Sequence, residues 1–252
     1  MSKDVLDEHY ERKYTSDVLS SIESIQTVRI PRTRFEAVAN FFPKYFKGGD
    51  ILELGAGNGM VTKWILDSNL NISSYTASEL SLPRLQGLRK NLKDERLSVV
   101  KLNAETVSEN NLGRYDAIIM IALIEHLIDP LGTMSKIKKL LKPGGFVYID
   151  TPNIAKYTRR IKLLLGKFPS TASKNEGLTT YSNEPVDLFD EGHLHYFTYR
   201  SLSLMLTERC GYSYVVKLGY PDGRVLIEDN INIFLATKWP EMFSELVVLV
   251  YR

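Results

Sequence analysis

Residues 50–59 read D-I-L-E-L-G-A-G-N-G, a short apolar stretch that leads into three glycines at alternate positions, Gly55, Gly57 and Gly59. The apolar residues predict a buried β-strand, and the periodic residues from Met60 onward predict a helix. A turn built from glycines can adopt positive φ angles and lets the backbone approach a ligand closely, because glycine has no Cβ. In open α/β sheets such a turn, at the carboxyl end of the first strand, binds nucleotide-like cofactors.

The spacing of the glycines separates two kinds of cofactor. A dinucleotide fingerprint is G-x-G-x-x-G, whose third glycine lies inside a helix that faces a pyrophosphate. This chain reads G-x-G-x-G, and Met60 stands where that third glycine would be. Glu53, two residues before Gly55, suits a cofactor that carries an ammonium or sulfonium group and opposes a pyrophosphate. The stretch resembles the first motif of the class I S-adenosylmethionine-dependent methyltransferases, in its E-x-G-x-G-x-G form.

Composition sets limits on the kind of protein. A chain of 252 residues with 44% hydrophobic content fits one α/β domain that buries roughly 70–75% of its unfolded surface. The net charge of +2 gives no reason to expect a nucleic-acid partner. A single cysteine, Cys210, excludes an internal disulfide and fits a reducing compartment. The charged N-terminus lacks the apolar core of a signal peptide, and no apolar run approaches the ~20 residues of a membrane span. We therefore expect a cytoplasmic protein without a transmembrane segment.

Strand-like and helical patterns alternate along the chain, as a parallel sheet with crossover helices requires. After the first strand we expect strands at residues 73–79, 97–102, 115–121, 146–150, 212–219 and 246–251. Helices are expected at residues 58–67 and 83–92, from Leu131 to a stop at P-G-G (residues 143–145), and from Thr198 to Gly211. The resemblance implies a Rossmann-like sheet of seven strands, mostly parallel with one late antiparallel strand, covered by helices on both faces. Residues 1–252 then form a single domain, in which residues 1–45 are capping helices.

Residues 154–192 interrupt this alternation. A basic, partly apolar piece at residues 156–168 is followed by a polar stretch, and loops of such length are usually functional covers or disordered. We expect a lid over the cofactor crevice that becomes ordered when ligands bind, with the leucines of residues 156–168 packed on the domain. The alternatives for this piece are contact with a membrane surface or with an anionic substrate.

The resemblance extends from about Phe35 to the C-terminus and implies contacts to the cofactor. Glu79, at the end of the second strand, would accept hydrogen bonds from both ribose hydroxyls. The family usually has D-A-E after the third strand, where this chain has Asn103 in place of the aspartate that accepts from the adenine amine. Arg34, with Arg32 as a competing candidate, would reach the cofactor carboxylate. The implied contacts to S-adenosyl-L-methionine and its product S-adenosyl-L-homocysteine are Arg34, Glu53, Gly55, Ala56, Gly57, Asn58, Gly59, Glu79, Leu80, Asn103, Ala104, Glu105, Ile121 and Ala122.

Two further segments carry information about the acceptor. Residues 121–130, I-A-L-I-E-H-L-I-D-P, resemble the E-H-x-x-D-P ending of ubiquinone-type O-methyltransferases, and the amine-methylating signature N-P-P-Y is absent from this position. Residues 190–198, D-E-G-H-L-H-Y-F-T, resemble a subgroup of methyltransferases tied to bacterial sugar and polysaccharide modification. His193 and His195 would point to one face of an extended segment, and with His126 they are the candidates for a catalytic base. The alternative for each is a hydrogen-bonded structural histidine.

Glu125 and His126 are also a candidate pair of metal ligands. Adjacent residues on a helix diverge by about 100°, so joint ligation requires an irregular turn. The sequence therefore predicts no metal site.

Together these observations predict an S-adenosylmethionine-dependent methyltransferase that acts on a hydroxyl of a small molecule, sugar or glycan. The expected partner is this acceptor, and the oligomeric state is not predicted. Two other functions stay open: a non-catalytic S-adenosylmethionine-binding regulatory protein, and a nicotinamide-dependent oxidoreductase, which Met60 and Glu53 disfavour.

Overall fold

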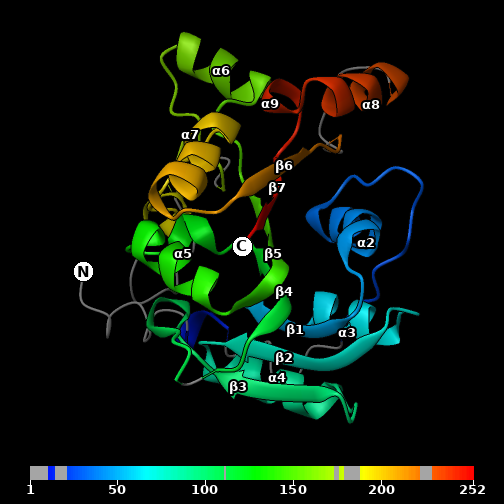
Figure 1. Cartoon of the computed structure of the whole chain (residues 1–252). Coiled ribbons are helices and arrows are strands. Elements are labelled where there is room, and N and C mark those ends of the chain that lie inside the picture. The colour runs from blue at the N-terminus through cyan, green and yellow to red at the C-terminus, as the bar shows by residue number, and fades with distance from the viewer. Residues whose placement is uncertain (1–10, 15–21, 111, 173–175, 179–187, 222–228) are drawn as a thin grey trace.

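A computed structural model of the chain describes residues 11–14, 22–110, 112–172, 176–178, 188–221 and 229–252. Seven strands form one sheet in the order β3-β2-β1-β4-β5-β7-β6 (Figure 1). They are β1 (Gly49–Leu54), β2 (Ile72–Glu79), β3 (Leu97–Lys101), β4 (Tyr115–Ile121), β5 (Leu141–Thr151), β6 (Tyr214–Leu218) and β7 (Leu246–Tyr251). β7 is antiparallel to both of its neighbours, β5 and β6, and all other pairs are parallel. The predicted sheet, with one late antiparallel strand, is confirmed.

Helices cover both faces of the sheet (Figure 1). They are α2 (Arg34–Tyr45), α3 (Met60–Asp67), α4 (Leu82–Asn91), α5 (Pro130–Lys139), α6 (Tyr157–Leu164), α7 (Tyr199–Leu204), α8 (Asp229–Lys238) and α9 (Pro240–Phe243). Successive residues of the inner strands point to opposite faces of the sheet and pack in two separate apolar cores. In β4, Ile118 packs in the core that contains Ile137 of α5, whereas Ile119 packs in the core that contains Phe42 of α2 and Ile65 of α3. This two-sided burial explains why β4 is apolar at almost every position.

The glycine turn between β1 and α3 needs glycine at each of its three positions. Gly55, Gly57 and Gly59 have φ angles of 71°, 57° and 88°. A Cβ on Gly59 would also lie 2.5 Å from a Leu88 methyl group of α4, so a side chain there would displace the helix packing. The turn therefore leaves bare backbone at the carboxyl end of β1.

The P-G-G sequence does not stop α5, contrary to the prediction. The helix ends at Lys139, and residues 143–145 lie inside β5. The pairing of β4 with β5 shifts there, from Tyr115 opposite Leu141 to Ala117 opposite Phe146. The extra residues form a bulge, which Gly144 permits by adopting a φ of 76°.

The apolar side chains in the insertion at residues 154–192 are not packed as predicted. No residue of α6 is buried, and the exposed fractions of Ile161, Leu163, Leu164 and Leu165 are 51%, 65%, 85% and 67%. The expectation that these leucines pack on the domain is wrong. The first turn of the helix does contact another part of the chain, where Tyr157 meets Phe243 and Arg159 pairs with Glu245. Residues 173–175 and 179–187 of the expected lid lie outside the described residues.

The expected capping helices at residues 1–45 are present in part. α2 and a short helical turn at residues 11–14 are helical, while residues 22–33 form no helix. Residues 1–10 and 15–21 lie outside the described part of the chain.

Candidate active site

Two adjoining cavities open at the carboxyl ends of β1 and β4. The smaller has a volume of about 150 Å³ and the larger about 880 Å³. Both are lined by Gly55 of the glycine turn, Ala122 after β4, and His126. All of the predicted cofactor residues except Gly59 line one or both cavities, and two of the predicted histidines, His126 and His193, line the larger one.

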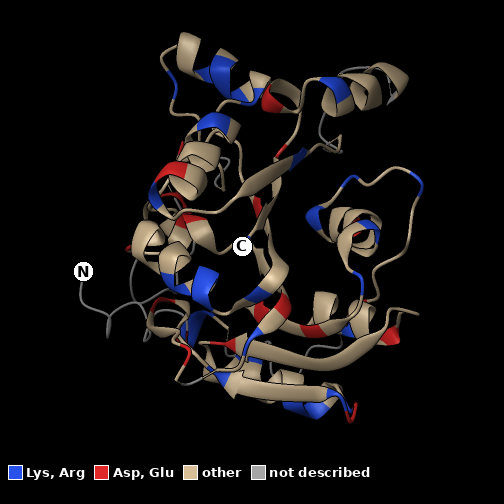
Figure 2. Ribbon diagram, in the orientation of Figure 1, with Lys and Arg blue, Asp and Glu red and all other residues tan. Residues whose placement is uncertain are grey.

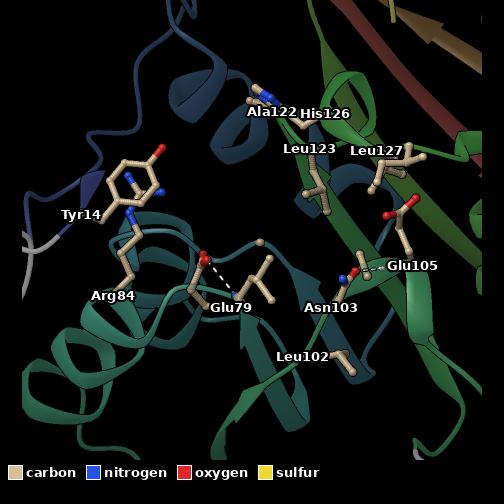
Figure 3. A pocket seen from close by; sticks show the side chains of 14 residues that line it. Tyr14, Glu79, Arg84, Leu102, Asn103, Glu105, Ala122, Leu123, His126 and Leu127 are labelled. Carbon is tan, nitrogen blue, oxygen red and sulfur yellow. Dashed lines mark hydrogen bonds between the residues drawn. The ribbon is translucent and has the colours of Figure 1, made fainter. Parts of the chain in front are cut away.

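The segments after β3 and β4 form much of the smaller cavity (Figure 3). Its lining is mixed, with Glu79, Arg84, Asn103, Glu105 and His126 as polar or charged groups. The apolar lining residues are Leu102, Ala104, Leu123, Leu127 and Ile128. A slot with apolar sides and a few polar groups is typical of sites for aromatic ligands.

Glu79 holds the glycine turn against the start of α4. Its Oε2 accepts a hydrogen bond from Gly57 N at 2.8 Å, and its Oε1 accepts from Leu80 N at 2.8 Å and Ser81 N at 3.0 Å. Three of about four acceptor positions of the carboxylate are thus filled by backbone N–H groups. The predicted contact with both ribose hydroxyls requires at least one of these bonds to be shared or exchanged.

The residues after β3 are partly engaged in local structure. Asn103 Oδ1 accepts from Glu105 N at 2.9 Å and so caps the short 3-10 turn η2 (Ala104–Thr106). Glu105 Oε1 accepts from Asp129 N at 2.8 Å, ahead of α5. All three residues from Asn103 to Glu105 line the smaller cavity, as the resemblance implies.

Two residues that line the cavities, Tyr14 and Arg84, were not predicted from the sequence. The Arg84 guanidinium carbon lies 3.2 Å from the centre of the Tyr14 ring, and both side chains line the two cavities (Figure 3). Arg84 lies on the first turn of α4, five residues after Glu79. Its position so close to a predicted cofactor residue could have identified it as a candidate. Tyr14 belongs to no motif, and nothing in its surrounding sequence distinguishes it.

Arg34, the residue predicted to contact the cofactor carboxylate, lines the larger cavity. This residue opens α2, whose start is fixed by a capping box between Thr33 and Glu36. About a third of its side chain (34%) is exposed, and its Nε lies 3.9 Å from Asp150 Oδ1. Burial raises the pKa of Asp150 to about 7, and the Arg34 charge opposes this shift. The competing Arg32 lines the same cavity.

Glu53 also lines the larger cavity, and its carboxylate is held from inside the protein. Its Oε2 accepts from the hydroxyls of Thr62 at 2.5 Å and Tyr75 at 2.6 Å. Burial raises the pKa of Glu53 to about 7. A cationic ligand in the cavity would therefore favour the ionised form of Glu53.

His126 and His193 contact each other in the larger cavity. The ring centroids are 4.6 Å apart, with the rings inclined by 82°. His126 Nδ1 lies 3.0 Å from the Gly192 carbonyl oxygen, which can only accept, so this nitrogen carries the proton. Burial lowers the pKa of His126 to about 4 and that of His193 to about 3, the latter with a contribution from His126. Both rings are therefore neutral near pH 7.

Asp190 organises the segment behind His193. It is fully buried and accepts from the hydroxyls of Ser170, Thr171 and Tyr196, the last two at 3.0 Å. Thr171 Oγ1 donates to this carboxylate and lies 2.6 Å from His193 Nδ1, so the histidine nitrogen must be the donor in that contact. The arrangement leaves the lone pair of His193 on Nε2.

The backbone around this segment is strained. Asp190, Glu191 and Gly192 have consecutive φ angles of 47°, 57° and 83°, and Ala122 has a φ of 48°. Non-glycine residues held in this region cost on the order of 1–3 kcal/mol each and tend to occur at functional sites. Both strained segments border the histidine pair.

His195 lies elsewhere. Its ring stacks on Phe197, with centroids 6.2 Å apart, and it lines neither cavity. The expected common face for His193 and His195 is not formed. The N–H groups of Leu194 and His195 both donate to the Glu125 carbonyl, so the segment is not a regular extended strand.

Glu125 and His126 do not lie on a regular α-helix, so the irregular turn that joint ligation requires is present. They lie in a 3-10 turn, η3 (Ile124–His126), and with His193 they bring one potential ligand atom each within 4.8 Å of one another. Glu125 is 1% exposed, its Oε2 accepts from Thr151 Oγ1 at 2.8 Å, and its Oε1 has no hydrogen-bond partner among the described residues. Burial raises the pKa of Glu125 to about 7. One carboxylate and two imidazoles are a donor set that divalent zinc-like ions accept.

The fold and site agree with comparisons to known proteins. A protein-family model described as a methyltransferase domain matches residues 28–217. The chain belongs to the class I S-adenosylmethionine-dependent methyltransferases. This membership confirms the predicted enzyme class and cofactor, and it argues against a nicotinamide-dependent oxidoreductase. The roles of individual site residues stay predictions.

Curated relatives of this methyltransferase include ubiquinone biosynthesis O-methyltransferases. That of Bordetella avium (strain 197N) is 28% identical over 109 residues, which cover 42% of this chain and 44% of the relative. That of Aliivibrio fischeri (strain MJ11) is 29% identical over 108 residues, covering 42% and 45%. The aligned part thus spans less than half the length of these relatives.

Solved structures share the fold at low sequence identity. The DhpI–SAM–HEP complex has a TM-score of 0.63 at 14% identity, with all of both chains covered. A SAM-dependent methyltransferase from Archaeoglobus fulgidus has a TM-score of 0.55 at 13% identity, covering 99% of this chain and 98% of the other. In the described part of the chain, no helix is long and apolar enough to cross a bilayer.

Proposed function

We propose that this methyltransferase transfers the methyl group of S-adenosylmethionine to a hydroxyl oxygen of a small molecule, most specifically of a sugar or glycan. The observation that carries the proposal is the His126–His193 pair, which lies in the larger cavity beside Gly55 and Ala122. This places neutral imidazoles where an acceptor would meet the cofactor.

The residues around the two cavities fit S-adenosylmethionine. The apolar slot near Asn103 suits the adenine, Glu79 lies at the position for the ribose, and Arg34 suits the carboxylate of the amino-acid end. The positive-φ glycines leave room for close backbone approach between these groups. When bound, S-adenosylmethionine supplies an electrophilic methyl group on a positively charged sulfur. The nearby Glu53 carboxylate favours that charge.

His193 is the better candidate for the base. Its Nδ1–H is committed to Thr171, so its Nε2 lone pair can accept the proton of an acceptor hydroxyl. The imidazolium that forms is favoured by the buried Asp190 carboxylate, which acts through the Thr171 hydroxyl. Glu125 belongs to the same cluster, but its raised pKa leaves this carboxyl group only partly ionised near pH 7. Positioning of the hydroxyl by these groups would supply a further part of the rate.

A sugar acceptor suits the rest of the larger cavity. Its wall carries charged and hydroxyl groups that can bind several hydroxyls at once. They include Arg32, Arg159, Glu191, Tyr220 and Glu245. The resemblance of residues 190–198 to sugar-modifying methyltransferases points in the same direction, and the curated relatives carry the name O-methyltransferase.

Methyl transfer to a panel of acceptors tests the proposal. Purified protein and S-adenosylmethionine with a labelled methyl group are incubated with sugar nucleotides, oligosaccharides, catechols, amines and carboxylic acids. We expect label in a sugar or another hydroxyl compound, as an ether that survives mild base. Label only in amines, or in base-labile esters, contradicts the proposal. A mock preparation from cells that do not express the protein controls for contaminating activity.

A further inference from the structure

Two helices at the end of the molecule opposite β3 expose apolar side chains. α6, α9 and α8 follow one another along this end (Figure 1). We define the apolar face as the exposed side chains of α6, α8 and the residues that directly follow them. It consists of Ile161, Leu163, Leu164, Leu165, Ile231, Phe234 and Trp239, each between 49% and 85% exposed. Large apolar side chains that are exposed in groups, as on these two helices, often mark an interaction site.

The apolar face is held in place by specific contacts. Glu245 pairs with Lys156 at 3.3 Å and with Arg159 at 2.7 Å, which fixes the first turn of α6. The Phe243 ring of α9 lies 5.2 Å from Tyr157 and 5.9 Å from Trp239. Because the same ring contacts both residues, the start of α6 and the end of α8 are connected through α9.

Positive charge surrounds the α6 part of the face. No Asp or Glu occurs between Asp150 and Glu176, whereas this stretch contains six Lys and Arg residues. Arg160, Lys162 and Lys167 form no ion pair with any described residue, and Figure 2 shows α6 with basic positions and no acidic ones. The excess charge is thus local, since the whole chain carries only +2.

We propose that the apolar face binds the surface of an anionic lipid bilayer, with α6 lying in the plane of the headgroups. In α6 and the residue that follows it, Ile161, Leu164 and Leu165 share one side of the helix, with Arg160 and Lys162 beside them, which is the composition of interfacial helices. The long side chains of Arg160 and Lys162 can reach phosphate groups while Leu164 enters the acyl boundary. Trp239 is a residue type enriched at that boundary.

A protein partner fits this surface less well. The centres of protein–protein interfaces are depleted in lysine, whereas lysines here alternate with the exposed leucines. The proposal does not rest on the identity of the methyl acceptor. It does relate to the site, since Arg159 of the same helix lines the larger cavity. Binding would hold that wall of the cavity close to the bilayer.

Vesicle co-sedimentation of the full chain tests the proposal. Vesicles of phosphatidylcholine with phosphatidylglycerol are compared with vesicles of phosphatidylcholine alone. We expect binding to the anionic vesicles that is at least about tenfold tighter and falls with added salt. Leu164→Glu removes an apolar contact, Lys162→Glu reverses a charge, and each should weaken binding at least about tenfold. Leu204→Glu on α7 is the matched control, since Leu204 is 48% exposed but is not part of the apolar face, and it should bind as the wild type does.

Three results overturn the proposal. They are absence of binding to anionic vesicles, equal binding to both vesicle types, and equal loss in the Leu204→Glu control. A stable dimer that Leu164→Glu dissociates, seen by sedimentation velocity without vesicle binding, would instead assign the face to a second copy of the chain. Circular dichroism checks that each variant is folded. If Leu164→Glu does not fold, Lys162→Glu is used as the test variant.

Discussion

The rings of His126 and His193 meet edge to face, with centroids 4.6 Å apart, although 67 positions separate them in the sequence. One short backbone segment orients both. The Gly192 carbonyl fixes Nδ1 of His126, and the next residue is His193 itself. Thr171 and Asp190 complete the support from behind. The site thus joins the end of β4 to the insertion after β5, and its geometry depends on both.

Alanine substitutions of the histidines should separate their roles. We expect His193→Ala to lower turnover at least about a hundredfold, since a positioned base contributes typically 10²–10⁴-fold. His126→Ala should also lower turnover, because it removes the ring that packs against His193. His195→Ala is the matched control and should stay near normal, since that ring lines neither cavity. Calorimetry with S-adenosylhomocysteine should show unchanged affinity in all three. Normal turnover of His193→Ala excludes it as the base.

The low pKa values of the pair predict an unusual pH dependence. The active form of the base is neutral, and the pKa values are lowered from 6.5 to about 4 for His126 and about 3 for His193. Protonation of the pair should therefore reduce kcat/KM only as the pH falls through about 4, with no loss from these groups between about pH 5 and 8. Proton NMR of the ring signals in the free protein measures the same titration directly. Ring titration near pH 6.5 would contradict the buried, neutral state of the pair.

The sequence predicted the strand–turn–helix at residues 50–67 and the approximate positions of the other strands, because these depend on local patterns. Apolar runs, glycines at alternate positions and a cap such as Thr198 act over a few residues, and the structure confirms the cap with a bond from Ser201 N. The second strand was placed to within one residue at its start.

The support of the histidine pair was not predictable in the same way. It depends on Asp190 and Glu191 holding positive φ, which neither residue type favours, and on Thr171, which lies 22 positions from His193. Tertiary contacts impose this conformation against local preference. The exposure of Leu164 was missed for a different reason. An amphipathic pattern shows that a helix has an apolar side, and does not show whether protein covers it.

Glu79 should contribute to cofactor affinity and to stability together. Glu79→Ala removes the acceptor for a ribose hydroxyl and for three backbone N–H groups. We expect a loss of about 1–3 kcal/mol in the binding free energy of S-adenosylhomocysteine, measured by calorimetry, and a lower melting temperature. Glu79→Gln keeps one acceptor oxygen and should lose less of both. Lower stability with unchanged affinity would restrict Glu79 to a structural role, and tight binding of NAD by the wild type would contradict the cofactor assignment.

Glu53 should make the protein less stable as the pH rises. Burial raises its pKa from 4.5 to about 7, so the folded state binds the proton more tightly than the unfolded state. Its contribution to stability is complete below about pH 4.5 and is lost as the pH rises through about 7. Relative to Glu53→Gln, which cannot ionise, the free energy of unfolding of the wild type should fall by roughly 3 kcal/mol over this range.

Urea denaturation at several pH values measures this difference for Glu53→Gln. Glu109→Gln serves as the control, since Glu109 is 40% exposed, and its difference from wild type should stay nearly constant. A constant difference for Glu53→Gln as well would mean that Glu53 is ionised throughout in the folded protein.

Removal of metal ions by a chelator should decide how the cluster of Glu125, His126 and His193 works. Either a histidine accepts the proton of the acceptor, or the cluster binds a metal ion. If His193 takes the acceptor proton, its Nε2 must be free of metal during turnover. We therefore expect dialysis against EDTA to leave turnover and melting temperature unchanged, and added Zn²⁺ to inhibit by occupying the same donors. The three potential ligand atoms lie close enough for this competition, within 4.8 Å.

A loss of turnover on chelation, restored by a stoichiometric divalent ion, would reverse this assignment. The two imidazoles would then be ligands, and the ion would lower the pKa of the acceptor hydroxyl in place of a base. Glu125→Gln distinguishes the cases further. It should abolish restoration by the ion if Glu125 Oε1, which no described residue hydrogen-bonds, completes the ligand set. Under base catalysis it should lower turnover only modestly and without dependence on added metal, because the raised pKa of Glu125 leaves its carboxyl group only partly ionised near pH 7.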